Sequence, residues 1–471
     1  MLTRAQGTIT GEELCWHAAW HAGLFVAGAR QTGDLAYLDN GVTFFDALRA
    51  RLHTSPDGYR GWVGPYIYGD SVYADVHVGD AILVRAMLDL AEYVRTELPA
   101  GQRHPYVEPV QQYIDLAEHV CAKWVARGTW QEYGHYGGYV SWDRFLTPGR
   151  MDAFQTRPEA PNAGLSLPFN KQQAMGIVHL RLFRLTGEPE HRRKAQLIFQ
   201  YTRSRMSAFA DQFTWDYWEP FYPGDVLSVH PPRLAHWVNT HPYRDYQAGE
   251  VDEFVEAYHS GLVFTRADME RLVRTNLRMW NGDSERPAWA NSDVAASRAA
   301  VPGSQPPTIP AGYAKLAGTL WTSLAEFDTT LARLAGRTAS NTGYRRRWNL
   351  PVTELDRPVP QVTSLQMGCA LPATVQRGGI VCLASKARVP GRLRVVLMDG
   401  AGSRELAELF AGTTPGGLDG LEGIAIAEWT AAVAPGEYRV RWTYDRGDGA
   451  PPEQRDDAVT VVAGPAGAER H

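Results

Sequence analysis

The chain has 471 residues, 44% hydrophobic and 21% charged, which is typical of a folded globular protein with room for two domains. Its 47 basic and 52 acidic residues give a net charge of −5 without a basic block, so nucleic acid is excluded as an expected partner. No apolar run reaches the length of a membrane-spanning helix, so a membrane partner is not expected.

Amphipathic helices dominate the first 336 residues and come in pairs. Residues 12–53 form a predicted helical hairpin with a turn at Gly33, and the same design recurs at 170–207 with a turn at Gly187. Glycine suits the left-handed residue that ends a helix. Apolar residues recurring every 3.6 positions predict the other helices. These lie at 81–94, 109–125, 250–260, 265–280 and 313–336.

Repeated helical hairpins must bury their apolar faces on one another, which predicts a solenoid or, if the ends meet, a closed ring. The long connections are aromatic and polar and fall at one set of helix ends, which favours closure and a single elaborated face. These connections are 54–77, 128–169, 208–249 and 281–312. We therefore predict a mainly α fold, an (α/α)-toroid of five to six helical hairpins over residues 1–345.

Beyond about residue 345 the apolar period changes from 3.6 to two, as in the alternation from Tyr438 to Tyr444. Glycine and proline turns separate four further predicted strands, at 378–387, 392–400, 423–431 and 457–464. The pattern predicts a C-terminal antiparallel β-sandwich over 346–465, followed by a disordered tail at 466–471. Spacing alone leaves open whether Cys369 and Cys382 form a disulfide.

The densest mixture of polar, titratable and aromatic side chains lies at 237–281, with a second concentration just upstream at 213–225. Flat rings beside hydrogen-bonding groups are what a protein needs to hold and act on a sugar chain. We expect these two stretches and the segment 68–80 to meet in one cleft. The predicted partner is a polysaccharide or oligosaccharide, and the oligomeric state stays open.

Three stretches carry a resemblance to a known group of enzymes: 169–195, 244–282 and 310–328. They resemble the α/α-toroid carbohydrate-active enzymes, which include alginate, chondroitin and heparin lyases and the six-hairpin glycosidases. The short sequence NTHPY at 239–243 is similar to the Asn-x-His plus aromatic cluster of alginate lyase-type enzymes.

The resemblance implies a polysaccharide lyase that cleaves a uronate-containing glycan by β-elimination. This reaction neutralises a carboxylate, removes the neighbouring proton and protonates the leaving oxygen. Asn239 and Arg244 are assigned to the carboxylate, and His241 to the base or to a second carboxylate contact. Tyr243 or Tyr258 would be the proton donor.

Two alternatives stay open. An inverting glycoside hydrolase would need a pair of carboxyl groups on opposite sides of the scissile bond. A non-catalytic glycan-binding protein on the same scaffold is favoured by Ala248, which stands where related toroids often carry histidine. The candidate carboxylates for hydrolysis are Asp216, Glu219, Asp245, Glu250 and Asp252, with Asp70, Asp75 and Asp80 on another loop.

Further residues are expected to contact the sugar, although core packing is an equal alternative for the aromatic ones. The expected sugar-binding residues are Arg244, Tyr246, Trp215, Trp218, Asp216, Glu219, Asn170, Gln173, Tyr136, Tyr139, Asp70 and His77.

No cofactor and no metal is predicted. His17 and His21 have the i, i+4 spacing of metal ligands, but no third ligand is evident near them. The start of the chain has no apolar signal core. The protein is therefore expected to be cytoplasmic, or secreted or periplasmic if a leader has been removed.

Overall fold

A computed structural model provides the fold, and it divides into two compact units. Unit 1 comprises Met1–Gln131, Tyr139–Leu167 and Lys171–Ile198, and unit 2 comprises Glu132–Gly138, Pro168–Asn170 and Phe199–His471. The residues that the structure describes are 10–66, 72–133, 136–142, 144–156, 164–209, 212–215, 217–219, 221, 225–228, 233–234, 244–289, 318–337, 365–367, 374–387, 391–414, 424–447, 449 and 451–463.

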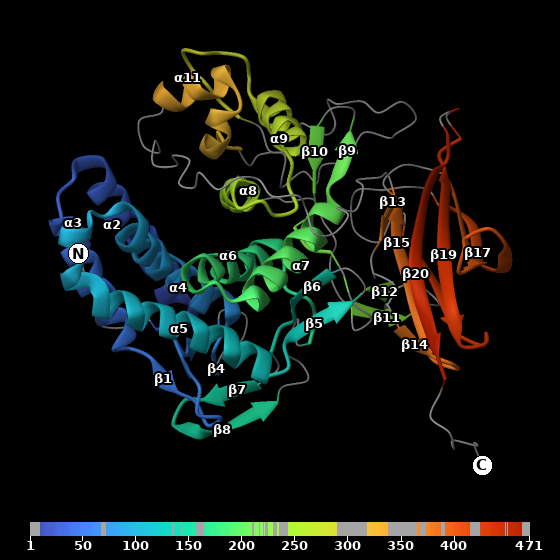
Figure 1. The fold of residues 1–471 in the computed structure, drawn as a ribbon, viewed down its shortest axis with the longest axis horizontal. Coiled ribbons are helices and arrows are strands. Elements are labelled where there is room, and N and C mark those ends of the chain that lie inside the picture. The colour runs from blue at the N-terminus through green and yellow to red at the C-terminus, as the bar shows by residue number, and fades with distance from the viewer. Residues whose placement is uncertain are drawn as a thin grey trace. The chain divides into compact units, whose positions relative to one another are not determined.

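Helices joined by short turns form the body of unit 1 (Figure 1). The first turn ends at Gly33, whose φ of 73° lets its N–H bond to the carbonyl of Ala29. Gly187, at φ 78°, bonds in the same way to Phe183. Both predicted turns are confirmed. The helices are α2 (Gly11–Thr32), α3 (Ala36–Arg49), α4 (His77–Glu92), α5 (Val107–Ala126), α6 (Phe169–Thr186) and α7 (Pro189–Arg205), with short turns η1 (Tyr93–Glu97), η2 (Ala100–Gln102) and η3 (His104–Tyr106) before α5.

Helix α4 is the central helix of unit 1, because 14 of its 16 residues are buried. It packs against α2 and α5, and its apolar residues belong to one continuous core with theirs. The buried carboxylate of Glu92 on α4 is neutralised by Arg184 of α6, whose Nε lies 2.6 Å from it. Burial of an acid on a central helix is tolerated here because a guanidinium accompanies it.

Small sheets form in the two long connections of unit 1. Tyr73 of β4 pairs with Leu146 of β7, which joins the connection before α4 to the connection before α6. These two predicted long connections therefore meet at one end of the helices. The strands are β1 (His53–Thr54), β2 (Arg60–Gly61), β3 (Gly64–Pro65), β4 (Tyr73–Ala74), β5 (Trp130–Tyr133), β6 (Tyr136–Tyr139), β7 (Arg144–Thr147) and β8 (Arg150–Thr156).

The helical part of unit 2 begins with short strands and continues with α8 and α9. Thr265 and Asp268 form a capping box that starts α9, as predicted from the threonine. Helix α8 begins six residues earlier than its predicted start at residue 250. The elements are β9 (Ser207–Phe209), β10 (Gln212–Thr214), β11 (Val226–Ser228), β12 (Arg233–Leu234), α8 (Arg244–His259), α9 (Arg266–Met279), η5 (Thr322–Glu326) and α11 (Thr329–Arg337).

The single helix predicted at 313–336 is wrong for its described part. Gly318 pairs with Trp289 instead, and a short 3₁₀ turn precedes α11. The Asp328 carboxylate accepts hydrogen bonds from the backbone N–H groups of Thr330 and Leu331 at 2.8 and 2.9 Å. An aspartate in that position starts a new helix, which is why the apolar period does not continue as one element.

The C-terminal part of unit 2 consists of two sheets, with strand orders β13-β15-β18 and β14-β20-β19-β16-β17. Because β14 pairs parallel with β20, the second sheet is mixed, whereas the prediction was purely antiparallel. Trp429 of β18 shares a buried core with Val395 and Trp442 of the larger sheet. The strands are β13 (Leu365–Met367), β14 (Thr374–Gln376), β15 (Ile380–Ala387), β16 (Gly391–Asp399), β17 (Glu405–Thr414), β18 (Ile424–Thr430), β19 (Gly436–Asp445) and β20 (Glu453–Val462).

The protein is thus mainly helical with a C-terminal region of two sheets. Closure of the hairpins into a toroid, the hairpin count and the β-sandwich stay predictions. The boundary near 345, the tail at 466–471, Cys369 and the side chain of Cys382 lie outside the described residues.

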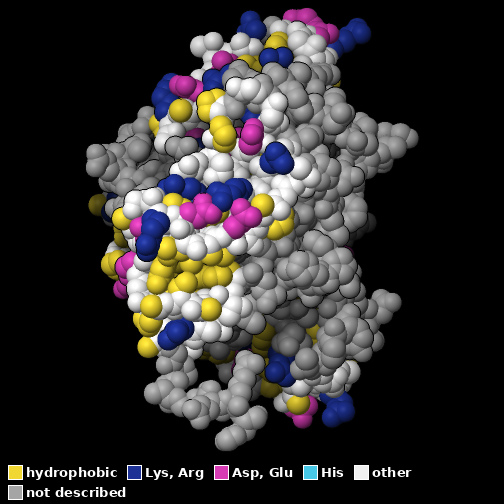
Figure 2. Space-filling view, turned by 90° about the vertical axis from the view of Figure 1, so that its right-hand side faces the viewer, with side chains coloured by type: hydrophobic (Ala, Val, Ile, Leu, Met, Phe, Trp, Pro, Cys, Tyr) yellow, Lys and Arg dark blue, Asp and Glu magenta, His cyan; other side chains and the backbone are white. Residues whose placement is uncertain are grey.

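Basic and acidic side chains stand next to one another on the face shown in Figure 2. The exposed part of the larger sheet follows the same pattern, since Arg394 pairs with Glu405 and Glu408. In the part of the chain that the structure describes, no helix is both long and apolar enough to cross a bilayer.

Candidate functional site

Four positions in the N-terminal half of α8 share one side of the helix, which we call the α8 face: Asp245, Ala248, Gly249 and Asp252. These positions follow at i, i+3, i+4 and i+7, so they lie on one side of the helix. Ala248, Gly249 and Asp252 are half-buried, whereas their neighbour Glu250 is buried. Among the described residues, a Cβ atom added to Gly249 would meet nothing within 4 Å beyond the backbone of its own helix. Open space therefore lies between two aspartate positions about 10.5 Å apart along the helix axis.

Aromatic rings from the segment 217–218 lie beside this part of α8. The ring of Tyr217 stacks on Tyr246 of α8, with centroids 5.9 Å apart and an interplanar angle of 24°. Trp218 meets Tyr217 edge-on at 6.3 Å. The backbone N–H of Phe169, the first residue of α6, donates to the carbonyl of Tyr217 at 3.1 Å. All three rings are half-buried, so part of each is open to a ligand.

Trp215, two residues before Tyr217, belongs to the core. Its side chain is 1% exposed and packs on Phe254 and Trp321 at centroid distances of 5.6 and 5.8 Å. Its indole Nε1 donates to the Glu250 carboxylate at 2.5 Å. Glu219 is also 1% exposed, and its carboxylate lies 3.7 Å from Nε of buried Arg205. Trp215 is therefore a support for α8 and offers no ring face to a sugar.

Several predicted site residues cannot be placed. For Arg244 and Asp245 the structure describes the helical backbone only, without the side chains. The predicted residues outside the described part of the chain are Asp70, Asp216, Asn239, His241 and Tyr243.

Tyr258 lies at the other end of α8. It follows Tyr246 by 12 residues, which corresponds to about 18 Å along the helix axis. Its ring packs against His259 and Phe327 at 5.0 and 5.4 Å. One sugar ring cannot contact Tyr246 and Tyr258 together.

The remaining predicted sugar contacts fall in the interior or at the start of α6. Asn170 is half-buried in the first turn of α6, and Gln173 is fully buried one turn later. Tyr136 and Tyr139 are both 0% exposed. In unit 2, Tyr136 accepts a hydrogen bond at 3.2 Å from Arg455 of β20. The two tyrosines therefore pack in the core, which was the alternative to sugar binding.

His77 is buried in unit 1, where its ring stacks on Trp124 at 3.6 Å. Its Nε2 shares a hydrogen bond of 2.9 Å with the hydroxyl of Thr129. Burial lowers the pKa of His77 well below its ordinary value, and the nearby Lys123 acts in the same direction. The imidazole is therefore neutral and forms part of the helix packing.

Asp75 and Asp80, two candidate carboxylates for hydrolysis, form a buried charged cluster in unit 1. Lys123 Nζ lies 2.7 Å from Asp75 and 2.6 Å from Asp80, and all three side chains are at most 1% exposed. Arg127 also contacts Asp75, at 2.8 Å. Burial raises the pKa of Asp80 to about 6 against the opposing effect of Lys123.

This cluster does not fit the carboxyl pair of an inverting hydrolase, and its burial keeps it from any substrate. Both carboxylates bind one ammonium nitrogen, so their bonded oxygens lie at most about 5.3 Å apart, below the ~6.5–9.5 Å of an inverting pair. Neither oxygen reaches solvent. The cluster instead holds the start of α4 against the end of α5.

A shallow pocket of 440 Å³ lies between α3, β2 and α5. Its lining carries both signs of charge, including Asp46, Arg49 and Asp115. Arg49 already bonds to Asp46 at 2.9 Å and to Gln112 at 2.6 Å. None of the predicted site residues lines this pocket, so we do not assign the site to it.

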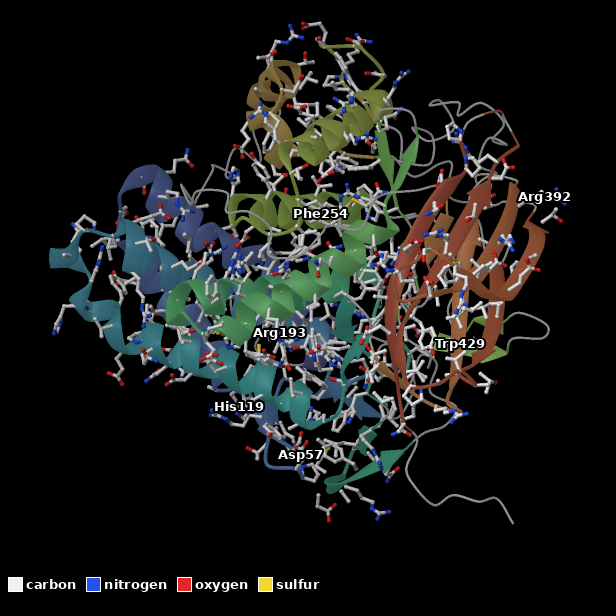
Figure 3. All side chains as sticks on the ribbon, turned by 45° about the vertical axis from the view of Figure 1, so that its right-hand side comes forward. Asp57, His119, Arg193, Phe254, Arg392 and Trp429 are labelled. Carbon is white, nitrogen blue, oxygen red and sulfur yellow. The ribbon has the colours of Figure 1, made fainter. Side chains whose placement is uncertain are left out.

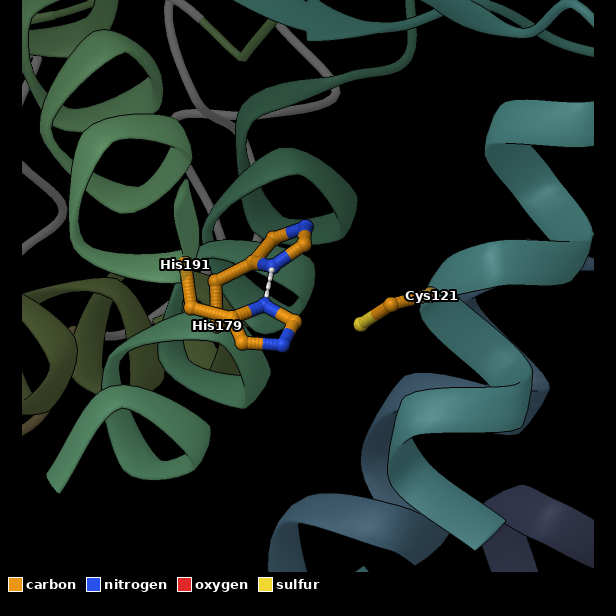
Figure 4. Close-up of side chains that lie close together, drawn as sticks. All are labelled: Cys121, His179 and His191. Carbon is orange, nitrogen blue, oxygen red and sulfur yellow. Dashed lines mark hydrogen bonds between the residues drawn. The ribbon is translucent and has the colours of Figure 1, made fainter. Parts of the chain in front are cut away.

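Sequence analysis missed two groups of residues. Tyr217 was not singled out, although it stands inside the aromatic segment 213–225 that was. The buried cluster of Cys121, His179 and His191 (Figure 4) was also missed. Both histidines lie in the predicted hairpin 170–207, but nothing in the local spacing connects them to Cys121.

No protein-family model and no curated protein matches the chain. Three solved structures show partial likeness. A GH76 α-mannanase of Bacteroides thetaiotaomicron has 11% identity and a TM-score of 0.39, covering 72% of this chain and 79% of that chain. A glycoside hydrolase family 76 mannosidase of the same organism has 10% identity and a TM-score of 0.33, covering 56% and 59%. An inactive α-1,6-mannanase variant of Salegentibacter sp. HEL1_6, in complex with α-1,6-mannotriose, has 15% identity and a TM-score of 0.31, covering 68% and 70%. TM-scores below 0.5 do not establish a common fold.

Proposed function

We propose that the protein is a glycoside hydrolase on a toroid of helical hairpins, and that Asp245 and Asp252 are its carboxyl pair. The observation that carries the proposal is the α8 face, which places these residues two turns apart with open space above Gly249 between them. Inverting hydrolysis needs carboxyl groups roughly 6.5–9.5 Å apart, so that a water fits beside the sugar. Positions about 10.5 Å apart along a helix allow this separation when the side chains lean toward each other.

The two carboxyl groups would divide the roles of acid and base. Asp245 stands in the first turn of α8, where the partial positive charge of the helix N-terminus favours an ionised carboxylate. An ionised group can accept a proton from the attacking water. Asp252 would then protonate the leaving oxygen, while Tyr217, Trp218 and Tyr246 supply ring surfaces for the sugar.

The charge of α8 favours a neutral glycan over a uronate polymer. Of its five acids, Glu250, Glu253 and Glu256 are buried, which leaves Asp245 and Asp252 at positions of the α8 face against one guanidinium, that of Arg244. A polymer with a carboxylate on each sugar would be repelled here, and β-elimination requires a cation or strong donors at that carboxylate. Tyr258, one of the two proposed proton donors for elimination, lies at the far end of the helix. Hydrolysis therefore replaces elimination as the preferred reaction.

The test is an activity assay on neutral glycans (mannans, xylans and glucans) and on uronate glycans. We expect new reducing ends from a neutral glycan, with product of inverted anomeric configuration by NMR. Asp252→Asn and Asp245→Asn should each lower kcat by about 10²-fold or more. Glu270→Gln changes a largely exposed acid on α9 that pairs with Arg266 of its own helix, and it should leave kcat unchanged. Products with the ultraviolet absorbance of a C4–C5 double bond, or full activity in both aspartate variants, would overturn the proposal.

A second candidate is a glycan-binding protein without turnover. It is favoured by the burial of Glu219 and Glu250, which are both 1% exposed and bonded to Arg205 and Trp215. In this case a glycan would bind without being cleaved. Trp218→Ala would then weaken binding, and Asp252→Asn would leave it unchanged.

A further inference from the structure

Three helices of unit 1 bring two histidines and a cysteine together in the interior. Cys121 of α5, His179 of α6 and His191 of α7 each offer one ligand atom, and these atoms lie within 4.8 Å of one another. The residues are 3%, 0% and 7% exposed. Figure 4 shows the sulfur of Cys121 directed toward the two imidazole rings. The cluster is independent of the proposed glycosidase site, because it shares no residue with the α8 face.

The two imidazole rings are oriented in the way that metal-binding histidines are. Their Nδ1 atoms face each other at 2.8 Å, so one nitrogen carries a proton and the other does not. The outer Nε2 of His179 is held by the hydroxyl of Tyr139 at 2.7 Å, and that of His191 by Glu118 at 2.8 Å. Oxygen partners on the outer nitrogens fix the rings of metal ligands and leave the inner nitrogens for the ion.

We propose that Cys121, His179 and His191 bind one Zn²⁺-class ion that ties α5 to the hairpin of α6 and α7. Zinc prefers nitrogen and sulfur donors at about 2.0–2.1 and 2.3 Å, so tetrahedral coordination needs spacings of about 3.3 Å between nitrogens and 3.6 Å from sulfur to nitrogen. The nitrogens must therefore separate by about 0.5 Å, and the sulfur must approach by at most about 1.2 Å. Side-chain rotations accommodate both changes without moving a helix.

Binding of the ion requires no oxidant or reductant and releases one proton. The thiol of Cys121 loses its proton to solvent as the sulfur–metal bond forms. The proton on the inner nitrogen pair is carried by an outer nitrogen instead, where Tyr139 or Glu118 accepts its hydrogen bond.

The site would be structural, because its ligands are closed off from substrate. Glu118, whose side chain is 40% exposed, marks the side from which the ion and a fourth ligand, water, can enter. Closed sites with sulfur and nitrogen ligands contribute directly to folding stability. Loss of the ion should therefore loosen α5 relative to α6 and α7 within unit 1.

The experiment titrates the chelator-treated full chain with Co²⁺ and with Zn²⁺. We expect one equivalent of Co²⁺ to produce d–d bands together with a near-ultraviolet thiolate-to-cobalt band, and Zn²⁺ to abolish both by competition. Zn²⁺ should also raise the Tm. Cys121→Ser, which preserves side-chain size, should lose the thiolate band, and His191→Ala should weaken binding at least tenfold.

Two control variants separate this site from others. Cys15→Ala removes the other described free buried thiol of unit 1 and should bind like the unmodified chain. His17→Ala removes one member of the exposed histidine pair on α2. A metal complex of that pair would have no sulfur ligand and would therefore give no thiolate-to-cobalt band. Uptake of less than about 0.2 equivalents by the unmodified chain, or an unchanged thiolate band in Cys121→Ser, would overturn the proposal whatever the outcome of the glycan assays.

Discussion

Replacement of Lys123 by methionine tests the electrostatic core of unit 1. The ammonium group is fully buried between Asp75 and Asp80, at 2.7 and 2.6 Å. Methionine keeps most of the apolar stem and removes the charge. Arg127 still contacts Asp75, whereas among the described residues Lys123 is the one cation that forms an ion pair with Asp80. Removing one partner of a buried pair costs about 3–5 kcal/mol, and we expect a loss of that size at pH 8.

The cost should depend on pH with a definite sign. Burial raises the pKa of Asp80 to about 6, above its unfolded value of about 3.9. The folded chain therefore binds this proton more tightly, and the contribution of Asp80 to the stability of the unmodified protein falls by about 3 kcal/mol as pH rises from about 4 to 6. Without Lys123 the pKa of Asp80 rises further. The loss caused by Lys123→Met should then be largest at pH 8 and smallest at pH 5, where Asp80 is protonated in both proteins.

Hydrogen exchange of peptides from α4 and α5 measures this loss locally, with the variant compared with the unmodified protein at each pH. A cost of 3–5 kcal/mol corresponds to exchange roughly 10²- to 5 × 10³-fold faster. Arg193→Met on α7 (Figure 3) is the control, because Arg193 is 36% exposed and pairs with exposed Glu190, a contact worth about 0.5 kcal/mol or less. Asp80→Asn should flatten the pH dependence. Equal losses of stability at pH 5 and pH 8, or a loss below about 1 kcal/mol at pH 8, would refute the reasoning.

Three further substitutions test the packing of unit 2. Thr265→Ala removes the capping box of α9 and should cost about 1 kcal/mol, seen as lost exchange protection in its first turn. Leu397→Ala opens a cavity in the centre of β16, where the side chain is fully buried, and should lower stability to urea by about 2–5 kcal/mol. Trp215→Phe removes the indole donor to Glu250 and should cost about 1–3 kcal/mol in thermal unfolding, whereas an unchanged Tm would show that this bond contributes nothing.

The helices of unit 1 were predictable because each buries one face on a neighbour, which leaves a 3.6-residue apolar period in the sequence. The start of α8 was missed for the opposite reason. Its first turn, Arg244 to Gln247, is polar, and Gly249 weakens the local preference for helix. That turn is a helix because the rest of α8 is packed. The sequence marks this polar turn as a candidate site through its titratable side chains, but the turn has no apolar period from which a helix could be predicted.

Strand β17 was missed because its sequence, ELAELFAGTT, is rich in residues that favour helices. Its pairing with β16 determines its conformation, including register shifts near Val395 and Leu397. The short strands in the long connections of unit 1 were missed for the same reason, because strand pairing determines their conformation. They form where Tyr73 meets Leu146 across a large sequence separation, which no local pattern encodes.

The candidate site was predictable in its composition but not in its orientation. Aromatic and acidic residues at 213–225 and on α8 were recognised as a group, and the structure brings Tyr217 against Tyr246. Which of these rings face a ligand depends on burial, which a list of residue types cannot supply. Trp215 and Trp218 stand three positions apart, yet the first is 1% exposed and the second is half-buried.

The rotation of α8 about its own axis decides which of its acids can act. Glu250 is turned inward by the bond from Trp215, and Trp215 is held by Phe254 and Trp321. A shift of one residue would turn the helix by about 100° and replace Asp252 by Glu253 on the open face. The buried aromatic residues that pack against α8 therefore determine which of its acids lie on the open face. A substitution such as Trp321→Ala, which touches no sugar, should lower activity by misplacing Asp245 and Asp252 together.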